Sequence, residues 1–267
     1  MSFPKYIIEK YPRATQRALE ILPGFVSWSL ILFPVWGSIF APLLVAYYII
    51  SFDVYWLYRS LLLAGSSLLA HFRIEASEKY DWMGDVMDFP DWKGVKHAVV
   101  IPVVKEPGSI LVRTLTTLAN QTIGAKQIIP IVAFEERAGS ELNDERERML
   151  TEKFGGVFEK IMFTRHPAGI VGEVIGKSAN SRWAALALAG EIKKHKSWRA
   201  EMMTISSTDS DAVFHPNHFA AVTYGFLDNP ARYRRIWQGA IMFYNNLDDI
   251  AWPMRVFNRV STVVYMG

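Results

Sequence analysis

The hydrophobic positions of this chain follow one pattern in its first quarter and another in the remainder. From Leu22 to Phe72 the sequence is almost continuously apolar, and its only fully charged side chains are Asp53 and Arg59. Such a block is too long for one membrane-spanning helix and fits two of about 20 residues each. We expect a short external turn over the uncharged region 37–42, which begins with Gly and ends with Pro. The pattern therefore predicts a transmembrane helical hairpin.

The charges around the apolar block predict its orientation. Basic residues flank both ends, and the expected turn has none: Lys5, Lys10, Arg13 and Arg17 precede the block, and Arg73 and Lys79 follow it. Because positive flanks stay on the cytoplasmic side, we expect a multi-pass protein of the cytoplasmic (inner) membrane whose remaining domain faces the cytoplasm. A cleaved signal peptide would have a shorter apolar core. A buried core of a soluble protein would be amphipathic, and Leu30 to Ile50 shows no such pattern.

Changes in residue composition divide the chain into four segments. Between the apolar block and the rest of the chain, acids, tryptophans and turn formers indicate a linker or capping segment. The expected segments are a cytoplasmic N-terminal segment (1–21), two transmembrane or interfacial helices (22–74), the linker (75–96) and a soluble domain (97–267).

In the soluble domain the hydrophobic period alternates between that of strands and that of helices. Short apolar runs rich in β-branched residues predict buried strands, and longer stretches with helical spacing predict helices between them. Strands are expected at 98–104, 127–134, 160–164 and 202–207, and helices at 111–120, 141–153, 177–194 and from near Pro216. The alternation predicts an α/β fold with a mostly parallel, doubly wound sheet and helices on both faces.

Composition narrows the class of protein. The chain has 51% hydrophobic residues, a formal net charge of +3 and no cysteine. The basic residues do not form the concentrated stripe of a nucleic-acid-binding surface, so we expect no nucleic-acid partner. The absence of cysteine excludes disulfides, thiolate metal sites and cysteine nucleophiles.

Polar side chains follow the predicted strands, at the edge of a parallel sheet where ligands bind. A Gly-Lys pair at a helix start suits a phosphate group, although the full phosphate-loop pattern is absent and an ordinary helix start is equally compatible. An acid after a strand is equally compatible with a solvated strand end. The candidates are Pro102, Lys105, Glu106, Glu135, Glu136, Arg137, Gly176, Lys177, Asn180, Asp209 and Asp211.

Asp209 and Asp211 carry the strongest prediction. Two carboxylates one residue apart can chelate a hard divalent cation, here Mg²⁺ or Mn²⁺, and leave coordination positions for a diphosphate. The alternative is that they cap the helix expected a few residues later, where Asp is favoured. The apolar run from Met202 to Ile205 that leads into the pair favours the metal site. His215 and His218 are expected to be structural or solvent-facing and not metal ligands.

The order of these motifs resembles that of the inverting family 2 glycosyltransferases with a GT-A fold, the group that includes the membrane-bound cellulose, chitin and hyaluronan synthases. The resemblance covers about Ala98 to Asn246. It is carried by the strand end Val100–Glu106, the acid Glu135, the helix start Gly176–Asn180, the Asp209–Asp211 pair and the block Trp237–Asn246. The chain departs from the family's pattern at Lys105, where Asn is usual, and at Glu135, where Asp is commoner.

The resemblance implies a role for each matched residue. The donor would be a nucleotide-diphosphate sugar such as a UDP-sugar, and the acceptor a lipid-linked or polysaccharide hydroxyl near the lipid bilayer. Donor binding would fall to Pro102, Glu106, Glu135, Lys177 and Asp209, metal binding to Asp209 and Asp211, and the acceptor side to Trp237, Gln238 and Asn245.

The resemblance also implies a later acidic pair that supplies the catalytic base. Asp248 and Asp249 follow the acceptor-like block too closely to be that pair, so we expect the base beyond Gly267 and a sequence that is part of a longer protein. Two other classes stay open. One is a membrane-anchored regulatory module that binds nucleotide sugars without chemistry. The other is a scaffold domain of a transporter or channel subunit, which predicts no metal-dependent nucleotide binding.

Overall fold

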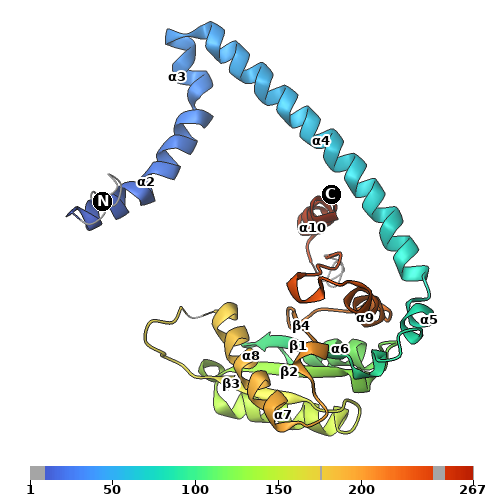
Figure 1. Cartoon of the computed structure of the whole chain (residues 1–267). Coiled ribbons are helices and arrows are strands. Elements are labelled where there is room, and N and C mark those ends of the chain that lie inside the picture. The colour runs from blue at the N-terminus through green and yellow to red at the C-terminus, as the bar shows by residue number, and fades with distance from the viewer. Residues whose placement is uncertain (1–9, 175, 243–249, 267) are drawn as a thin grey trace. The chain divides into compact units, whose positions relative to one another are not determined.

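The computed structural model of the chain describes residues 10–174, 176–242 and 250–266. The chain divides into two compact units, Met1–Leu68 together with Gly267, and Leu69–Met266. Long helices make up the first unit, and the second contains a sheet with helices on its faces (Figure 1).

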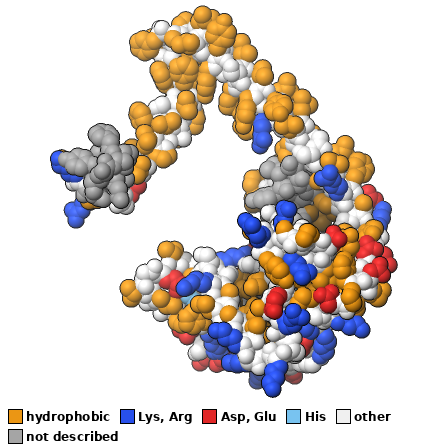
Figure 2. Space-filling model, in the orientation of Figure 1, with side chains coloured by type: hydrophobic (Ala, Val, Ile, Leu, Met, Phe, Trp, Pro, Cys, Tyr) orange, Lys and Arg blue, Asp and Glu red, His pale blue; other side chains and the backbone are white. Residues whose placement is uncertain are grey.

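The apolar block folds into helices α2 (Pro12–Ile31), α3 (Phe33–Phe40) and α4 (Pro42–Lys79). Most of their large apolar side chains are exposed, and hydrophobic atoms cover these helices along their length (Figure 2). Among the described residues no single helix is long and apolar enough to cross a membrane. The consecutive helices α2 and α3, bent by 63° at their junction, meet that criterion only as a pair.

The chain breaks at two points within the apolar block. Ala41 separates α3 from α4, within the region expected to turn. The sequence-based interpretation did not place a break at Leu32, which separates α2 from α3. Pro34 lies in the first turn of α3, where its ring and missing N–H are tolerated, and it cannot continue a preceding helix. The first expected span is therefore divided, whereas α4 runs without a break for 38 residues.

Close packing fixes the corner between α3 and α4. The hydroxyl of Tyr48 donates to the Leu30 carbonyl oxygen at 3.1 Å, and the rings of Phe33 and Tyr48 have centroids 5.2 Å apart. A Cβ at Gly37 would lie 2.6 Å from Cε2 of Phe33. A larger residue at position 37 would therefore displace the Phe33 ring.

The segment expected to be a linker or cap (75–96) contains regular structure. α4 continues to Lys79, and α5 (Trp82–Met87) and the short helix η1 (Trp92–Gly94) follow. Val86 of α5 is fully buried and belongs to the main hydrophobic core. In the structure this segment therefore covers one end of the core.

A parallel four-stranded sheet forms the centre of the second unit. Its strands are β1 (Lys96–Val103), β2 (Ile128–Glu135), β3 (Met162–His166) and β4 (Met203–Ser207), in the spatial order β3-β2-β1-β4. Nearly all residues of β1 and β2 are buried, because both faces of a parallel sheet are covered and its central strands are apolar throughout. The α/β class and the parallel sheet predicted from the sequence are confirmed.

Helices cover both faces of the sheet, as predicted. On one face α6 (Gly108–Ala119) and α7 (Ser140–Phe154) pack against β1 and β2, and α9 (His218–Asp228) adds Phe219 to the same core. α8 (Lys177–Lys194) packs on the other face. In α6 the buried leucines at positions 111, 115 and 118 recur at helical spacing, so one face of that helix makes the core contacts.

β4 is less buried than the sequence suggests. Ile205 was expected in a buried run, but it is 60% exposed. Among the residues that the structure describes, β4 pairs only with β1 and lies at the edge of the sheet, while α8 packs over β1, β2 and β3. The apolar run thus marks a strand whose outer part is uncovered.

A buried histidine joins β4 and α9 to the centre of the sheet. The ring nitrogens of His97 in β1 lie 2.7 Å from Oγ1 of Thr204 and 2.8 Å from Oγ1 of Thr223. Burial, with a smaller contribution from nearby His218, lowers the pKa of His97 to about 3. The imidazole is therefore neutral at physiological pH.

Candidate functional site

A pocket of about 380 Å³ lies at the carboxyl ends of the strands. β2 lies on one side of β1 and β4 on the other, so the direction of strand succession reverses between β1 and β4. Ligands of open parallel sheets bind outside such a reversal, where the loops diverge. The pocket is lined by Pro102, Val104, Glu106, Ile110, Glu135, Lys177, Asn180, Asp209, Ser210 and Asp211.

The pocket contains all six residues that the sequence singles out for donor or metal binding. They come from the end of β1, the end of β2, the start of α8 and the loop after β4. The fold therefore brings together residues that are far apart in the chain. The roles of these residues remain predictions.

The loop between β1 and α6 forms one wall of the pocket. The Glu106 carboxylate oxygen Oε2 accepts a hydrogen bond from the Val104 N–H at 2.6 Å. Pro102, near the end of β1, lies opposite Ala133 of β2 in the sheet. Glu106 thus shapes the loop as well as lining the pocket.

Arg146 of α7 supports this loop from behind and was not among the predicted site residues. Its Nη1 donates to the Val104 carbonyl oxygen at 3.1 Å, and its Nη2 donates to the Glu106 carbonyl oxygen at 2.5 Å. The side chain is buried, and that burial lowers its pKa. A signal existed in the sequence, because Arg146 shares the helical spacing of Asn143 and Leu150. Because α7 has many charged residues, its buried face was hard to recognise from the sequence.

Glu135 lies at the buried end of β2. It is 3% exposed, which excludes the alternative of a solvated strand end. Its Oε2 lies 3.5 Å from Nε of Arg137 and 3.5 Å from Nδ1 of His166. Nε2 of His166 lies 3.1 Å from the Glu173 carboxylate, in the loop that leads to α8. The pocket therefore has a buried carboxylate with nitrogen groups on two sides.

α8 begins at the pocket. Gly176 is its N-cap, with an extended backbone, so no capping side chain covers the first turn. One turn later the Asn180 amide donates to the Ala133 carbonyl oxygen at 2.7 Å and fixes the helix to β2. The N-terminus of α8, with its partial positive charge, is thus held beside Lys177 at the edge of the pocket.

Asp209 and Asp211 follow β4 directly. Lys177 donates to Oδ1 of Asp209, forming an ion pair between the start of α8 and the end of β4. The two side chains are 51% and 74% exposed, so a charged ligand could replace this pair at little cost. The capping alternative is wrong, because α9 begins at His218 and has Asn217 at its N-cap.

A polar row, formed by two threonines of α6 and by Gln121 just after that helix, fixes the loop that follows Asp209. The buried hydroxyl of Thr114 donates to the Ser210 carbonyl oxygen at 2.7 Å, and the Thr117 hydroxyl accepts from the Phe214 N–H at 3.3 Å. The Gln121 amide donates to the His215 carbonyl oxygen at 2.9 Å. Thr114 and Thr117 lie one turn apart in α6, and Gln121 lies two residues beyond the end of that helix. α6 and the residues that follow it therefore hold the backbone of this loop from behind, which no motif in the sequence indicates.

The carboxylates of the pocket suit a hard divalent cation whose remaining ligands come from a phosphate and from water. Among the described residues no group of three or more His, Asp or Glu side chains gathers as a complete metal site. Mg²⁺ is commonly bound by one or two carboxylates, substrate phosphates and water. Asp209 and Asp211, which both line the pocket, supply that number of carboxylates.

Two of the residues predicted for the acceptor side, Trp237 and Gln238, are not among the residues that line the pocket. Trp237 packs against Phe226 of α9, with ring centroids 6.4 Å apart. Gln238 is exposed in the segment that follows. Asn245 lies outside the described residues. An acceptor role for these residues stays a prediction.

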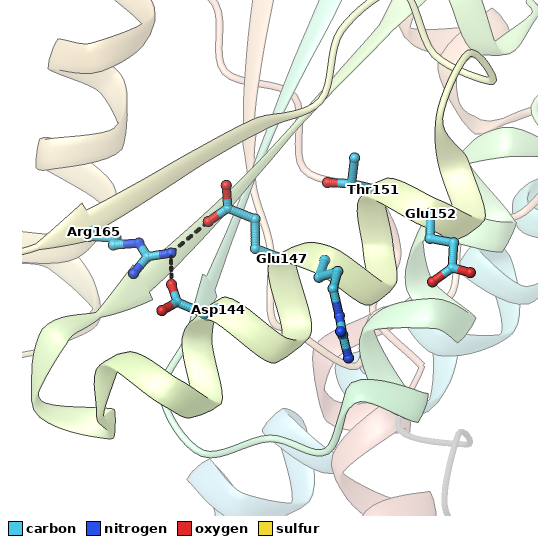
Figure 3. A pocket seen from close by; sticks show the side chains of 6 residues that line it. Asp144, Glu147, Thr151, Glu152 and Arg165 are labelled. Atoms are coloured by element: carbon cyan, nitrogen blue, oxygen red, sulfur yellow. Dashed lines mark hydrogen bonds and ion pairs between the residues drawn. The ribbon is translucent and has the colours of Figure 1, made fainter.

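A larger cavity, of about 570 Å³, lies against α7 and β3 (Figure 3). It is lined by Asp144, Glu147, Arg148, Thr151, Glu152 and Arg165. Arg165 points between two acids and pairs with Glu147 at 2.7 Å and with Asp144 at 2.6 Å, and these bonds raise its pKa. Because Arg165 already pairs with two acids and none of the described candidate residues lines this cavity, its volume alone does not make it the functional site.

Comparisons with known proteins give structural likeness without a sequence match. No protein-family model and no curated protein sequence matches the chain. Among solved structures, it is similar to the mannosyltransferase PcManGT from Pyrobaculum calidifontis in complex with GDP-Man and Mn²⁺, with 18% sequence identity and a TM-score of 0.34. The match covers 64% of this chain and 43% of that chain. A likeness of this strength carries no argument about function.

Proposed function

We propose that this chain carries the donor-binding part of a glycosyltransferase that uses a nucleotide-diphosphate sugar, with a UDP-sugar as the expected donor. The observation that supports the proposal most strongly is the convergence of Pro102, Glu106, Glu135, Lys177, Asp209 and Asp211 on one pocket. These residues were selected from the sequence by their position after predicted strands and by the family resemblance, and the pocket lies where the strand order reverses.

In the proposed reaction the acceptor hydroxyl oxygen bonds to the anomeric carbon of the sugar from the side opposite the diphosphate. The bond from that carbon to the diphosphate oxygen breaks, and the nucleoside diphosphate leaves with the electron pair. The acceptor proton passes to a general base. The products are the glycosylated acceptor, with inverted configuration, and the free nucleoside diphosphate.

The pocket residues would act chiefly on the leaving group. Asp209 and Asp211 would hold Mg²⁺ or Mn²⁺, a Lewis acid that neutralises diphosphate charge. Lys177 would release Asp209 and donate to a diphosphate oxygen, which the N-terminus of α8 also favours. Glu106 and Glu135 would border the nucleoside.

The helices α2, α3 and α4 would anchor the protein in the cytoplasmic membrane. Their exposed apolar side chains and the basic residues on both flanks support this assignment. The sugar-transfer unit would then face the cytoplasm, and its acceptor would be a lipid-linked or polysaccharide hydroxyl close to the bilayer surface.

Removal of the two carboxylates tests the proposal directly. In the double variant Asp209→Asn/Asp211→Asn, UDP affinity measured by calorimetry should no longer increase when Mn²⁺ is added. The control variant Asp88→Asn/Asp91→Asn removes two exposed acids outside the pocket and should keep the Mn²⁺ effect. Unchanged Mn²⁺-dependent UDP binding in the Asp209/Asp211 variant would sink the metal-site assignment.

A second measurement separates an enzyme from a binding module. Incubation of the protein with a radiolabelled UDP-sugar and Mn²⁺ should release UDP, by transfer to an acceptor or, more slowly, to water. Tight Mn²⁺-dependent binding without any UDP release would instead identify a module that holds nucleotide sugars without chemistry.

A further inference from the structure

The last helix of the chain is amphipathic. In α10 (Trp252–Met266) successive residues are turned by about 100°, so the positions of Trp252, Val256 and Val260 fall on one side. Asn258 and Thr262 fall on the opposite side. The helix therefore has separate apolar and polar faces.

The exposure of these two faces is the reverse of that in a water-soluble protein. Trp252 is 74% exposed, Val256 52%, Phe257 63% and Val260 55%. On the polar side Asn258 is half-buried and Thr262 is fully buried. A surface helix of a soluble domain buries its apolar side, so the apolar side of α10 is placed for contact with something else.

The charges of this region favour an anionic partner. After Asp228 the sequence has five arginines, two aspartates and neither lysine nor glutamate, which accounts for the whole formal net charge of +3. Two of these arginines, Arg255 and Arg259, lie in α10 itself. In a two-fold dimer through this face, the same arginines of both copies would approach one another, which like-charge repulsion opposes.

We propose that α10 lies in the plane of a lipid bilayer surface, with its apolar side among the upper acyl chains and its arginines among anionic headgroups. Interfacial helices combine an apolar face with basic residues in this way, and anionic lipids attract each such residue. This surface goes beyond the proposed sugar transfer, and it is distinct from the anchor assigned to α2–α4.

The absence of cysteine allows a site-specific test on the full chain. Val260→Cys and Asn258→Cys place a single thiol on nearly opposite sides of α10, and each can carry an environment-sensitive fluorophore. Both labelled proteins are reconstituted into vesicles of phosphatidylcholine, alone or mixed with phosphatidylglycerol. Nitroxide-bearing lipids then quench the label only where it lies in the bilayer.

We expect nitroxide quenching at position 260 to be severalfold stronger than at position 258, to increase with phosphatidylglycerol and to decrease with salt. Equal quenching at both positions would overturn the proposal. A label at 260 that is shielded from water but insensitive to nitroxide lipids would also overturn it, and would indicate a protein partner. The nitroxide quenching does not depend on nucleotide binding, so a negative result would leave the proposed function unchanged. Mn²⁺-dependent UDP binding by the same labelled proteins tests the proposed function separately.

Discussion

The ammonium group of Lys177 at the start of α8 pairs with the Asp209 carboxylate at the end of β4. In the proposed reaction the two side chains serve different partners, since Lys177 binds diphosphate and Asp209 binds metal. The Lys177 ammonium occupies one lone-pair direction of the Asp209 carboxylate, and its positive charge opposes a cation bound at the same group. Loading of the pocket would therefore exchange one ion pair for two new interactions.

Lys177→Met should shift metal and nucleotide binding in opposite directions. Without its competitor, Asp209 should bind Mn²⁺ alone up to about fivefold more tightly, because an exposed ion pair is worth about 0–1 kcal/mol. UDP in the presence of Mn²⁺ should bind about 10- to 100-fold more weakly, since a hydrogen bond to a charged group is lost. Calorimetry with Mn²⁺ alone and then with UDP measures both. Lys194→Met, at the other end of α8, is the matched control. If the affinities for Mn²⁺ and for UDP changed in the same direction, the proposed exchange of the Lys177–Asp209 ion pair for ligand contacts would be wrong.

Arg146→Met should loosen the Glu106 wall of the pocket. The variant leaves the carbonyl oxygens of Val104 and Glu106 without their donor, and a buried unsatisfied group costs about 1–3 kcal/mol. We expect a lower free energy of unfolding of that order and weaker UDP binding. Arg148→Met changes the same residue type at an exposed position of the same helix and should leave both quantities near those of the native chain. If the two substitutions had equal effects on stability and UDP binding, Arg146 would not position the Glu106 wall of the pocket.

Thr114→Val should weaken metal binding without touching a metal ligand. Valine keeps the shape of threonine and removes the hydroxyl that donates to the Ser210 carbonyl oxygen between the two aspartates. The expected cost is about 1–3 kcal/mol of stability, together with a lower affinity for Mn²⁺. Thr116→Val is the control, because the Thr116 hydroxyl donates within α6 to Val112 and is exposed. Titration of Mn²⁺ by electron paramagnetic resonance would detect the difference, and equal affinities for the two variants would contradict the prediction.

Acid should destabilise the second unit through His97. The unfolded chain protonates this histidine near pH 6.5, whereas the folded chain holds it neutral down to about pH 3. The contribution of neutral His97 to the free energy of unfolding should therefore be complete above pH 6.5. Below that pH the free energy of unfolding should fall by up to about 1.4 kcal/mol for each pH unit. Denaturant unfolding at about pH 7 and about pH 5.5 measures the loss. His97→Gln should reduce that loss by about 1 kcal/mol. A loss as large as that of the native chain would rule out His97 as its source.

The parts of the fold that depend on local pattern were predictable from the sequence. β1 and β2 are buried on both faces, so their apolar runs are continuous, and the predicted bounds lie within two residues of those observed. Gly176 marks the start of α8, where the helix begins as predicted. The place of the pocket was also predictable, because in a parallel sheet the residues after each strand meet at one edge. The same reasoning selected Lys105, Glu136 and Arg137, which do not line the pocket.

The remaining features depend on contacts between distant segments, which leave no pattern in one stretch of sequence. The sequence around Ser210 does not indicate its contact with Thr114, and the sequence around Val104 does not indicate its contact with Arg146. Ile205 was misjudged for a related reason. Its burial depends on whether a helix covers the edge of the sheet, and an apolar strand has the same composition in either case.

The polar row of α6 and Gln121 imposes a length on the chain beside it. Thr114 and Thr117 lie one turn apart in α6 and Gln121 lies just beyond its end, and together they bond to the backbone groups of Ser210, Phe214 and His215. Inserting or deleting a single residue between Asp211 and His215 would put carbonyl oxygens out of step with this row and displace Asp211. Substitutions in this loop should therefore be tolerated more readily than any change in the number of its residues, a distinction that a deep mutational library with single-residue indels would make visible.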